Sequence, residues 1–139
     1  MVTALKDLSQ KIIDILKADA VLLAAIKTWG FGEPVTVVPY PQVWVQLVGG
    51  PSRWKTGNAM QQKIQYNIVI EDRHGDRDTV EKVVMDYCDR ACAALKAKPD
   101  LDGNARCVGF DDFRAYPRRK KDAAIARIEI DLRVEREYV

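Results

Sequence analysis

The stretch Gln61–Leu95, QQKIQYNIVIEDRHGDRDTVEKVVMDYCDRACAAL, decides the fold because its hydrophobic period changes once along its length. Apolar residues first alternate with mostly polar neighbours, which predicts a strand with one buried face over Gln62–Ile70. The alternating apolar residues are Ile64, Tyr66, Ile68 and Ile70. Charged turn residues follow at Glu71–Asp76. Apolar residues then recur at helical spacing until Pro99, which predicts a helix over Asp76–Ala97 of about 33 Å that needs a sheet beneath it.

Further helices are predicted before this stretch. An amphipathic pattern over Thr3–Lys17, with Thr3 as its cap, predicts a first helix. Asp19 looks like the cap of a second helical piece over Ala20–Lys27. Gly30 and Gly32 then loosen the chain.

The remaining segments supply the sheet. Val35–Val38 predicts a short strand, and Val43–Val48, apolar on both faces, predicts a central one. The segment Ala105–Tyr116 has partial strand character, and the interruption at Asp111–Asp112 indicates a bulge. In Ala124–Val139 small and branched apolar residues alternate with charges of both signs, which predicts a strand with cross-strand ion pairs on its outer face.

This order of elements predicts an α+β fold: a mostly antiparallel sheet of four to five strands with helices packed on one face. The chain has 139 residues, and no linker, repeat or low-complexity segment interrupts it. We therefore expect one domain that spans residues 1–139.

Composition narrows the functional classes. With 47% hydrophobic and 30% charged residues the chain is typical of a soluble globular protein, and its net charge of +2 gives no general argument for nucleic-acid binding. No apolar run approaches the roughly 18 residues of a membrane span. The start shows no signal-peptide pattern, so we expect a cytoplasmic protein without a membrane partner.

Catalytic and metal-binding signals are sparse. Cys88 and Cys92 are four residues apart, but no second Cys or His pair completes a tetrahedral site, so they and Cys107 are interpreted as core or half-buried residues. The single histidine, His74, lies in an acidic turn that lacks the terminal glutamate of a calcium loop. No nucleophile elbow or phosphate loop is present. We expect no enzymatic activity, no cofactor and no metal.

A long loop over Gly49–Ala59 is the first candidate contact site. It carries Trp54 between Arg53 and Lys55, with nothing apolar nearby in sequence to bury the ring. The favoured interpretation is an aromatic anchor in a protein–protein interface. The alternatives are packing against its own domain and stacking on a nucleic-acid base.

A second predicted loop, Pro117–Asp122, carries four consecutive cations: Arg118, Arg119, Lys120 and Lys121. The simple interpretation is a solubilising hairpin tip. The alternative is contact with phosphates, either directly or in a ring to which each subunit contributes one such tip.

The chain resembles the tail terminator and related tail-completion (head–tail joining) proteins of long-tailed bacteriophages. The resemblance lies in the order and lengths of the elements, not in a motif. The elements concerned are the amphipathic start Leu5–Leu16, the strand Val43–Val48, the loop Gly49–Ala59, the strand Gln62–Ile70, the helix Asp78–Ala97 and the charged strand Ala124–Glu135.

The resemblance implies a structural virion protein of the tail or neck, assembled in the host cytoplasm into a homo-oligomeric ring, commonly of six copies. Such a ring caps the tail tube, ends its polymerisation and offers a surface to the head connector or stopper protein, while DNA passes through the hole without sequence-specific binding. Arg53, Trp54 and Lys55 would then contact the tube or a neighbour. The tip Arg118–Lys121 would face the lumen or the head side. The alternatives are another neck or head-completion protein and a small nucleic-acid-binding α+β module, whose sheet would present stacking aromatics.

Overall fold

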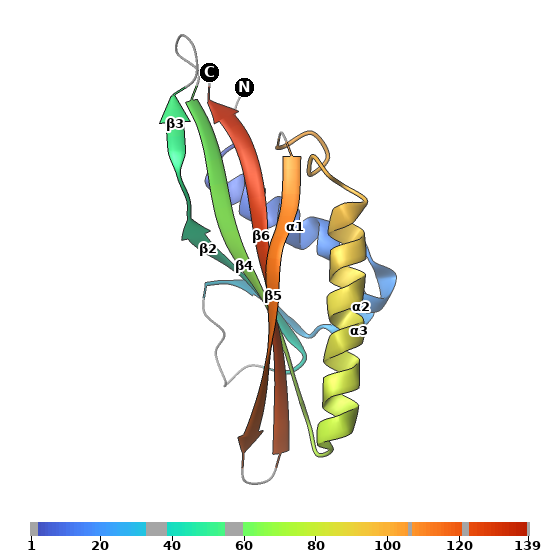
Figure 1. Ribbon diagram of the computed structural model, residues 1–139. Coiled ribbons are helices and arrows are strands. Elements are labelled where there is room, and N and C mark those ends of the chain that lie inside the picture. Colours follow the sequence, from blue (N-terminus) through green and yellow to red (C-terminus); the bar gives the residue numbers. More distant parts are fainter. Residues whose placement is uncertain (1–2, 33–38, 55–59, 106, 121–122, 139) are drawn as a thin grey trace.

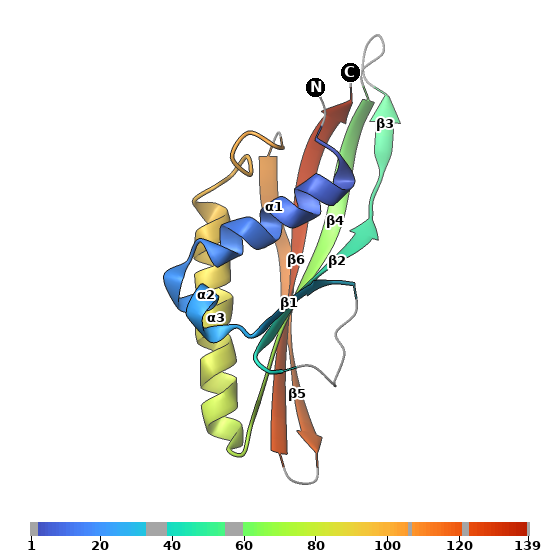
Figure 2. The ribbon, with the colours of Figure 1, turned by 180° about the vertical axis from the view of Figure 1, so that it is seen from behind.

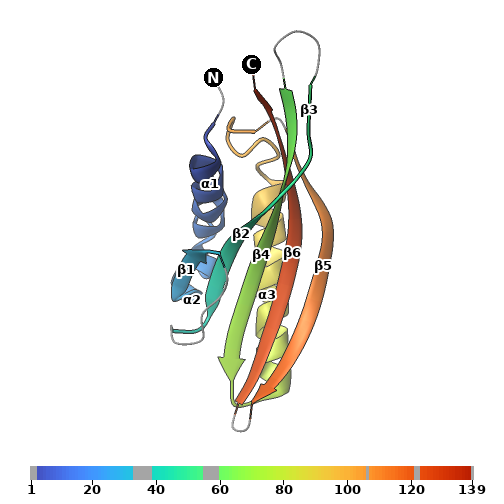
Figure 3. The ribbon, with the colours of Figure 1, turned by 90° about the vertical axis from the view of Figure 1, so that its left-hand side faces the viewer.

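The computed structural model describes residues 3–32, 39–54, 60–105, 107–120 and 123–138 (Figure 1). A sheet forms one layer and three helices cover one of its faces, as the side view in Figure 3 shows. The predicted α+β class is confirmed. The elements are α1 (Leu5–Lys17), α2 (Ala20–Ala25), β1 (Thr28–Phe31), β2 (Gln42–Gly49), β3 (Ser52–Trp54), β4 (Met60–His74), α3 (Arg77–Lys96), β5 (Cys107–Lys120) and β6 (Ala123–Tyr138).

The described residues form a six-stranded sheet in the order β1-β2-β4-β6-β5, with β3 pairing with β4 beyond the end of β2. Among these strands, only the β1–β2 pair is parallel. The sheet exceeds the predicted four to five strands because β1 and β3 form within segments that the sequence marks as loops. The predicted central position of β2 is confirmed, since it lies between β1 and β4. The predicted strand Val35–Val38 lies outside the described residues.

The alternating pattern of β4 and β6 builds the core. The apolar side chains of both strands point toward the helices and pack against one stripe of α3, as predicted. The stripe consists of Val80, Val84, Cys88, Ala91 and Leu95. The strand residues are Ile64, Tyr66, Ile68 and Ile70 of β4 and Ala126, Ile128, Ile130, Leu132 and Val134 of β6. From behind, α1 is seen to cross the same face of the sheet (Figure 2).

One of the two helix caps predicted from the sequence is confirmed. The Asp19 carboxylate accepts hydrogen bonds from the backbone N–H groups of Val21 and Leu22, both at 3.0 Å, as expected. Asp76 caps α3. The prediction that Thr3 caps α1 is wrong: Ala4 is the N-cap, and the Thr3 hydroxyl instead donates to the Asn104 side chain at 3.3 Å.

Two strands run further than predicted. β4 continues through Glu71 to His74 because β6 pairs with it along its whole length, so the charged turn predicted at Glu71–Asp76 starts later. β5 continues through Pro117 to Lys120, which an edge strand tolerates because, among the described strands, β6 is its one neighbour. The predicted bulge is confirmed: the register of β5 shifts between Phe110 and Asp112.

Candidate functional site

The first candidate contact segment forms a hairpin with the start of β4. Arg53 pairs with Gln61 and Trp54 pairs with Met60, so the prediction of a loop over the whole of Gly49–Ala59 is wrong. The hairpin depends on Gly50, whose φ is +151° and whose backbone lies so close to β4 that a Cβ would overlap the Lys63 carbonyl oxygen. Arg53 is exposed, and Lys55 lies outside the described residues.

The second candidate segment also belongs to a hairpin. Arg118, Arg119 and Lys120 pair with Ile125, Ala124 and Ala123 of β6, respectively. The prediction of a loop over Pro117–Asp122 is therefore wrong up to Lys120, because the β5–β6 ladder continues to its last described residues. Lys121 lies outside the described residues. The backbone of Arg118, Arg119 and Lys120 therefore belongs to a strand.

The two hairpins lie at opposite ends of the sheet (Figure 1). β4 connects the two ends: Met60 lies beside β3, and His74 pairs with Ala124 next to the cationic end of β5. At about 3.3 Å per residue, the 15 residues of β4 span about 50 Å. The structure thus separates the two candidate segments along the whole length of the sheet.

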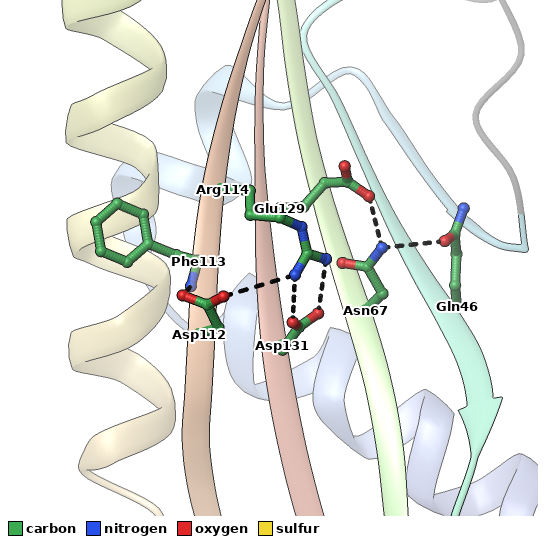
Figure 4. A network of polar contacts seen from close by, with 7 residues as sticks. All are labelled: Gln46, Asn67, Asp112, Phe113, Arg114, Glu129 and Asp131. Carbon is green, nitrogen blue, oxygen red and sulfur yellow. Dashed lines mark hydrogen bonds and ion pairs between the residues drawn. The ribbon is translucent and has the colours of Figure 1, made fainter.

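The sheet face opposite the helices, here called the open face, is a network of paired polar side chains (Figure 4). The Arg114 guanidinium donates two hydrogen bonds to the Asp131 carboxylate, at 2.6 and 3.0 Å. The Asn67 amide donates to Glu129 at 2.6 Å and to Gln46 at 3.4 Å. These contacts join β2, β4, β6 and β5 across the sheet. The predicted cross-strand ion pairs are confirmed.

A second, more buried network on the same face lies around Glu71, which is 3% exposed. The Gln42 amide donates to its carboxylate at 3.1 Å, and the Arg127 guanidinium lies 3.3 Å away as an ion pair. The Trp44 indole donates to Gln42 at 3.0 Å. The Trp44 ring lies so close to Gly30 of β1 that a Cβ there would overlap it. The hydrogen bonds and the ion pair of Glu71, Gln42, Trp44 and Arg127 are therefore formed within this network.

The pairing of the charges on the open face argues against the alternative of a nucleic-acid-binding module. Such a module needs exposed aromatic rings on its sheet face and cations available for phosphates. In the described part of the open face, Trp44 is half-buried against β1, and Arg114, Arg127 and Arg133 all form ion pairs with carboxylates. Tyr66 lies on the helix side, 1% exposed, where Ser9 donates to its hydroxyl at 3.0 Å. The open face offers no stacking platform within the described residues.

The acidic segment around His74 forms the N-terminal cap of α3. The backbone N–H of Asp76 donates to His74 Nδ1 at 3.2 Å, and the Asp76 carboxylate accepts from Thr79 at 2.6 Å and from the Asp78 N–H. The Thr79 hydrogen bond contributes most to a lowered pKa of the Asp76 carboxyl. No group of three or more metal-ligating side chains occurs within the described residues.

The cysteine pair lies on α3, where Cys88 is buried and Cys92 is half-buried, as interpreted from the sequence. The two thiols share one hydrogen bond. It raises the pKa of Cys88, with burial acting in the same direction, and lowers the pKa of Cys92.

Sequence reasoning missed two apolar patches at the edges of the sheet. Phe110 and Phe113 of β5 are 41% and 65% exposed at one edge, and Phe31 and Leu47 are 50% and 51% exposed near the other. The predicted bulge at Asp111–Asp112 is a sequence signal for the first patch, because an extra residue changes the face on which the following side chains lie. No sequence signal marks the second patch, because its two residues are sixteen positions apart and come together only through β1–β2 pairing.

The elements define a small α+β protein: an antiparallel sheet, extended by one parallel edge strand, with helices on one face and ion pairs on the other. No helix within the described residues is long and apolar enough to cross a membrane.

No protein-family profile matches the chain, and no curated protein matches it significantly. Among solved structures, the fold is similar to that of a chain from the virion of a native gene transfer agent particle. The two are 20% identical with a TM-score of 0.46, and the match covers 91% of this chain and 92% of that chain. A likeness of this size carries no functional argument.

Proposed function

We propose that the protein is a structural virion subunit of a phage-like particle that closes the end of the tail. In this role it acts as a tail terminator: copies form a ring on the finished tail tube, stop its polymerisation and join the tail to the head connector. The chain acts as one domain over residues 1–139, and its work is assembly, without a catalysed reaction or a cofactor.

One observation carries the proposal. The two hairpins that the sequence marks as contact segments lie at opposite ends of a sheet about 50 Å long. A subunit that joins a tube to a connector needs two different contact surfaces that face away from each other. Trp54 at one end and the cations Arg118–Lys120 at the other meet this requirement.

The end that carries Trp54 is proposed to contact the tail tube. An aromatic residue flanked by Arg53 and Lys55 has the composition of an interface anchor. The close approach of Gly50 to the Lys63 carbonyl brings the backbone of β3 alongside the start of β4.

The opposite end is proposed to face the lumen or the head connector. Arg118, Arg119, Lys120 and Lys121 place four positive charges within four residues. Repeated around a ring, such charges create a positive potential that attracts the phosphates of passing DNA without reading its sequence. On the open face, by contrast, the guanidinium groups of Arg114, Arg127 and Arg133 are paired with carboxylates.

The test measures tail length. Tail tubes of the parent particle are assembled with wild-type protein, with Trp54→Ala, with the fourfold alanine variant of residues 118–121, or with the control Lys63→Ala, and are measured by electron microscopy. We expect overlong tubes with Trp54→Ala and normal tubes with the control. The fourfold variant should give tubes of normal length that join heads poorly.

Tubes of normal length that join heads normally with Trp54→Ala would contradict the proposed tube contact. The same assay separates the alternative of a neck protein. If omission of the wild-type protein leaves tube length unchanged but yields tails without heads, the chain acts after termination. Light scattering coupled to size exclusion, over a range of protein and salt concentrations, tests for a ring-sized species.

A further inference from the structure

Cys88 and Cys92 form a pair of thiols on one side of α3. Residues four apart in a helix lie about one turn apart along the axis and about 40° apart around it, so their side chains are neighbours. Cys88 belongs to the apolar stripe that packs on the sheet, and Cys92 packs against that core from beside it. The two thiols share one hydrogen bond, so their sulfur atoms are in contact. The proposed assembly function does not use this pair.

The two sulfur atoms differ in their access to solvent. Cys88 is 8% exposed and lies within the core, whereas Cys92 is half-buried and keeps part of its surface in contact with water. Neither cysteine forms a disulfide. An ion from solution can therefore reach Cys92 first, and the apolar neighbours of Cys88 shield the second sulfur from water.

The helical spacing does not suit a disulfide bond between the two thiols. The Cβ atoms of residues four apart in a helix are about 5–6 Å apart. A disulfide needs Cβ atoms about 3.5–4.5 Å apart and a sulfur–sulfur bond of about 2.05 Å, so α3 would have to unwind locally. A metal ion between the sulfurs has no such requirement, because two metal–thiolate bonds of about 2.3 Å span sulfur atoms up to about 4.6 Å apart. The geometry of α3 therefore favours a bridging ion over a disulfide.

The number and type of the ligands select the ion. Zn²⁺ takes four protein ligands in structural sites and three in catalytic sites. No group of three or more His, Cys, Asp or Glu side chains that could hold a metal occurs in the part of the chain that the structure describes. Soft thiolate ligands instead select Cu(I), which is satisfied by two sulfur ligands in a linear arrangement.

The hydrogen bond between the thiols prepares one ligand. The thiolate, not the thiol, binds metals. The hydrogen bond from Cys88 lowers the pKa of Cys92, while burial and the nearby Asp89 carboxylate act in the opposite direction. Binding of the ion then releases the proton of Cys88, so that two thiolates hold it. The complex carries one net negative charge where two adjacent thiolates alone would carry two, which reduces the cost of burying them.

We propose that Cys88 and Cys92 bind one Cu(I) ion per chain, held between their two sulfur atoms. The site lies on a single helix of a single chain, so it needs no second copy and no tail component. The inference is therefore independent of the proposed function.

The test measures Cu(I) uptake by the full chain, reduced and without oxygen, in competition with a chromophoric Cu(I) chelator. Cys92→Ser replaces the accessible ligand, and Cys88→Ala replaces the buried one. Cys107→Ser is the matched control, because Cys107 is the third cysteine of the chain and pairs with Glu135 at the start of β5. Circular dichroism verifies that each variant is folded, and X-ray absorption at the copper edge counts the sulfur ligands.

We expect wild type and Cys107→Ser to bind one Cu(I) per chain, each with two sulfur ligands. Each variant of the pair should bind at least about 100-fold more weakly, because even the loss of an outer-shell partner costs about 10- to 100-fold in metal affinity. Zn²⁺ at the same concentration should not displace the copper, since the site offers two ligands and not four.

Four results would overturn the proposal: a wild-type protein that takes no Cu(I) from the chelator, a Cys92→Ser variant that binds as wild type does, a Cys107→Ser variant that loses binding, or one ion shared by two chains. Cys92→Ser decides the question if Cys88→Ala fails to fold, because Cys92 lies at the margin of the core. Tail length does not enter this test, so the copper site and the proposed function are judged separately.

Discussion

The ion pair between Glu71 and Arg127 provides a quantitative test of the open face. Its two side chains are 4% and 16% exposed. The Arg127 Nε lies 3.3 Å from Glu71 Oε2 without hydrogen-bond geometry, while the Arg127 Nη2 donates a long hydrogen bond of 3.5 Å to Glu71 Oε1. The pair therefore depends mainly on charge proximity in a poorly hydrated site, and the Gln42 amide is the second partner of the carboxylate.

We expect Arg127→Met to destabilise the protein strongly. Methionine keeps an unbranched apolar stem but removes the charge, so the buried Glu71 carboxylate loses its counter-ion. Breaking a buried pair in this way costs about 3–5 kcal/mol. Because part of Arg127 remains in contact with water, we expect a value near the lower end, about 3 kcal/mol.

Adding Glu71→Gln to Arg127→Met should restore most of the loss. The glutamine oxygen still accepts from Gln42, and no buried charge remains. We expect the double variant to lie within about 1 kcal/mol of wild type, with a coupling energy of about 2 kcal/mol.

The assay is equilibrium urea unfolding of wild type, both single variants and the double variant. Arg114→Met is the control, because the Arg114 side chain is 39% exposed in its pair with Asp131 and its loss should cost no more than about 1 kcal/mol. If Arg127→Met costs no more than Arg114→Met, Glu71 is hydrated and the reasoning fails.

Two further predictions follow from single sites. Burial raises the pKa of the Asp72 carboxyl, so its contribution to stability is present below its unfolded pKa of about 3.9 and is lost as pH rises through the higher folded value. Asp72→Asn should therefore be more stable than wild type at about pH 7 and equal to it at about pH 3 by urea unfolding; a gain of equal size at both values would contradict the assignment. Gly30→Ala should force the Trp44 ring from its place and cost about 1–3 kcal/mol, with a red-shifted emission when Trp29 and Trp54 are replaced by phenylalanine; unchanged emission would show that the ring does not lie over β1.

Hydrophobic period predicted the parts of the fold that have one buried face. The alternation in β4 and β6 identified both the strands and the face that meets the helices, and the stripe on α3 set that helix within one residue at each end. These patterns are local, because each residue's burial follows from its own neighbours in sequence.

Short edge strands were not predictable in the same way. β1 contains Gly30, and β3 follows Gly49, Gly50 and Pro51, residues that normally mark turns. Both strands exist because a long neighbour offers backbone partners, and that information lies elsewhere in the chain. Pro117 likewise predicted the end of the strand at Tyr116, but the outer edge of β5 tolerates a residue without an N–H group.

The candidate contact residues were found in part. Composition singled out Trp54 and the cations Arg118–Lys120, while the two apolar patches depended on strand order and on one bulge. A bulge was expected at Asp111–Asp112, but its consequence for Phe110 and Phe113 requires the register with β6.

The long β4–β6 ladder has a mechanical consequence. All 15 residues of β4 pair with β6, from Met60 with Tyr138 to His74 with Ala124, and the interstrand hydrogen bonds lie across the strand direction. A force that pulled the two ends of the sheet apart, along opposite strands, would load these bonds together in shear, and they could not open one after another like a zipper. The sheet would then resist extension and transmit a pulling force from one hairpin end to the other.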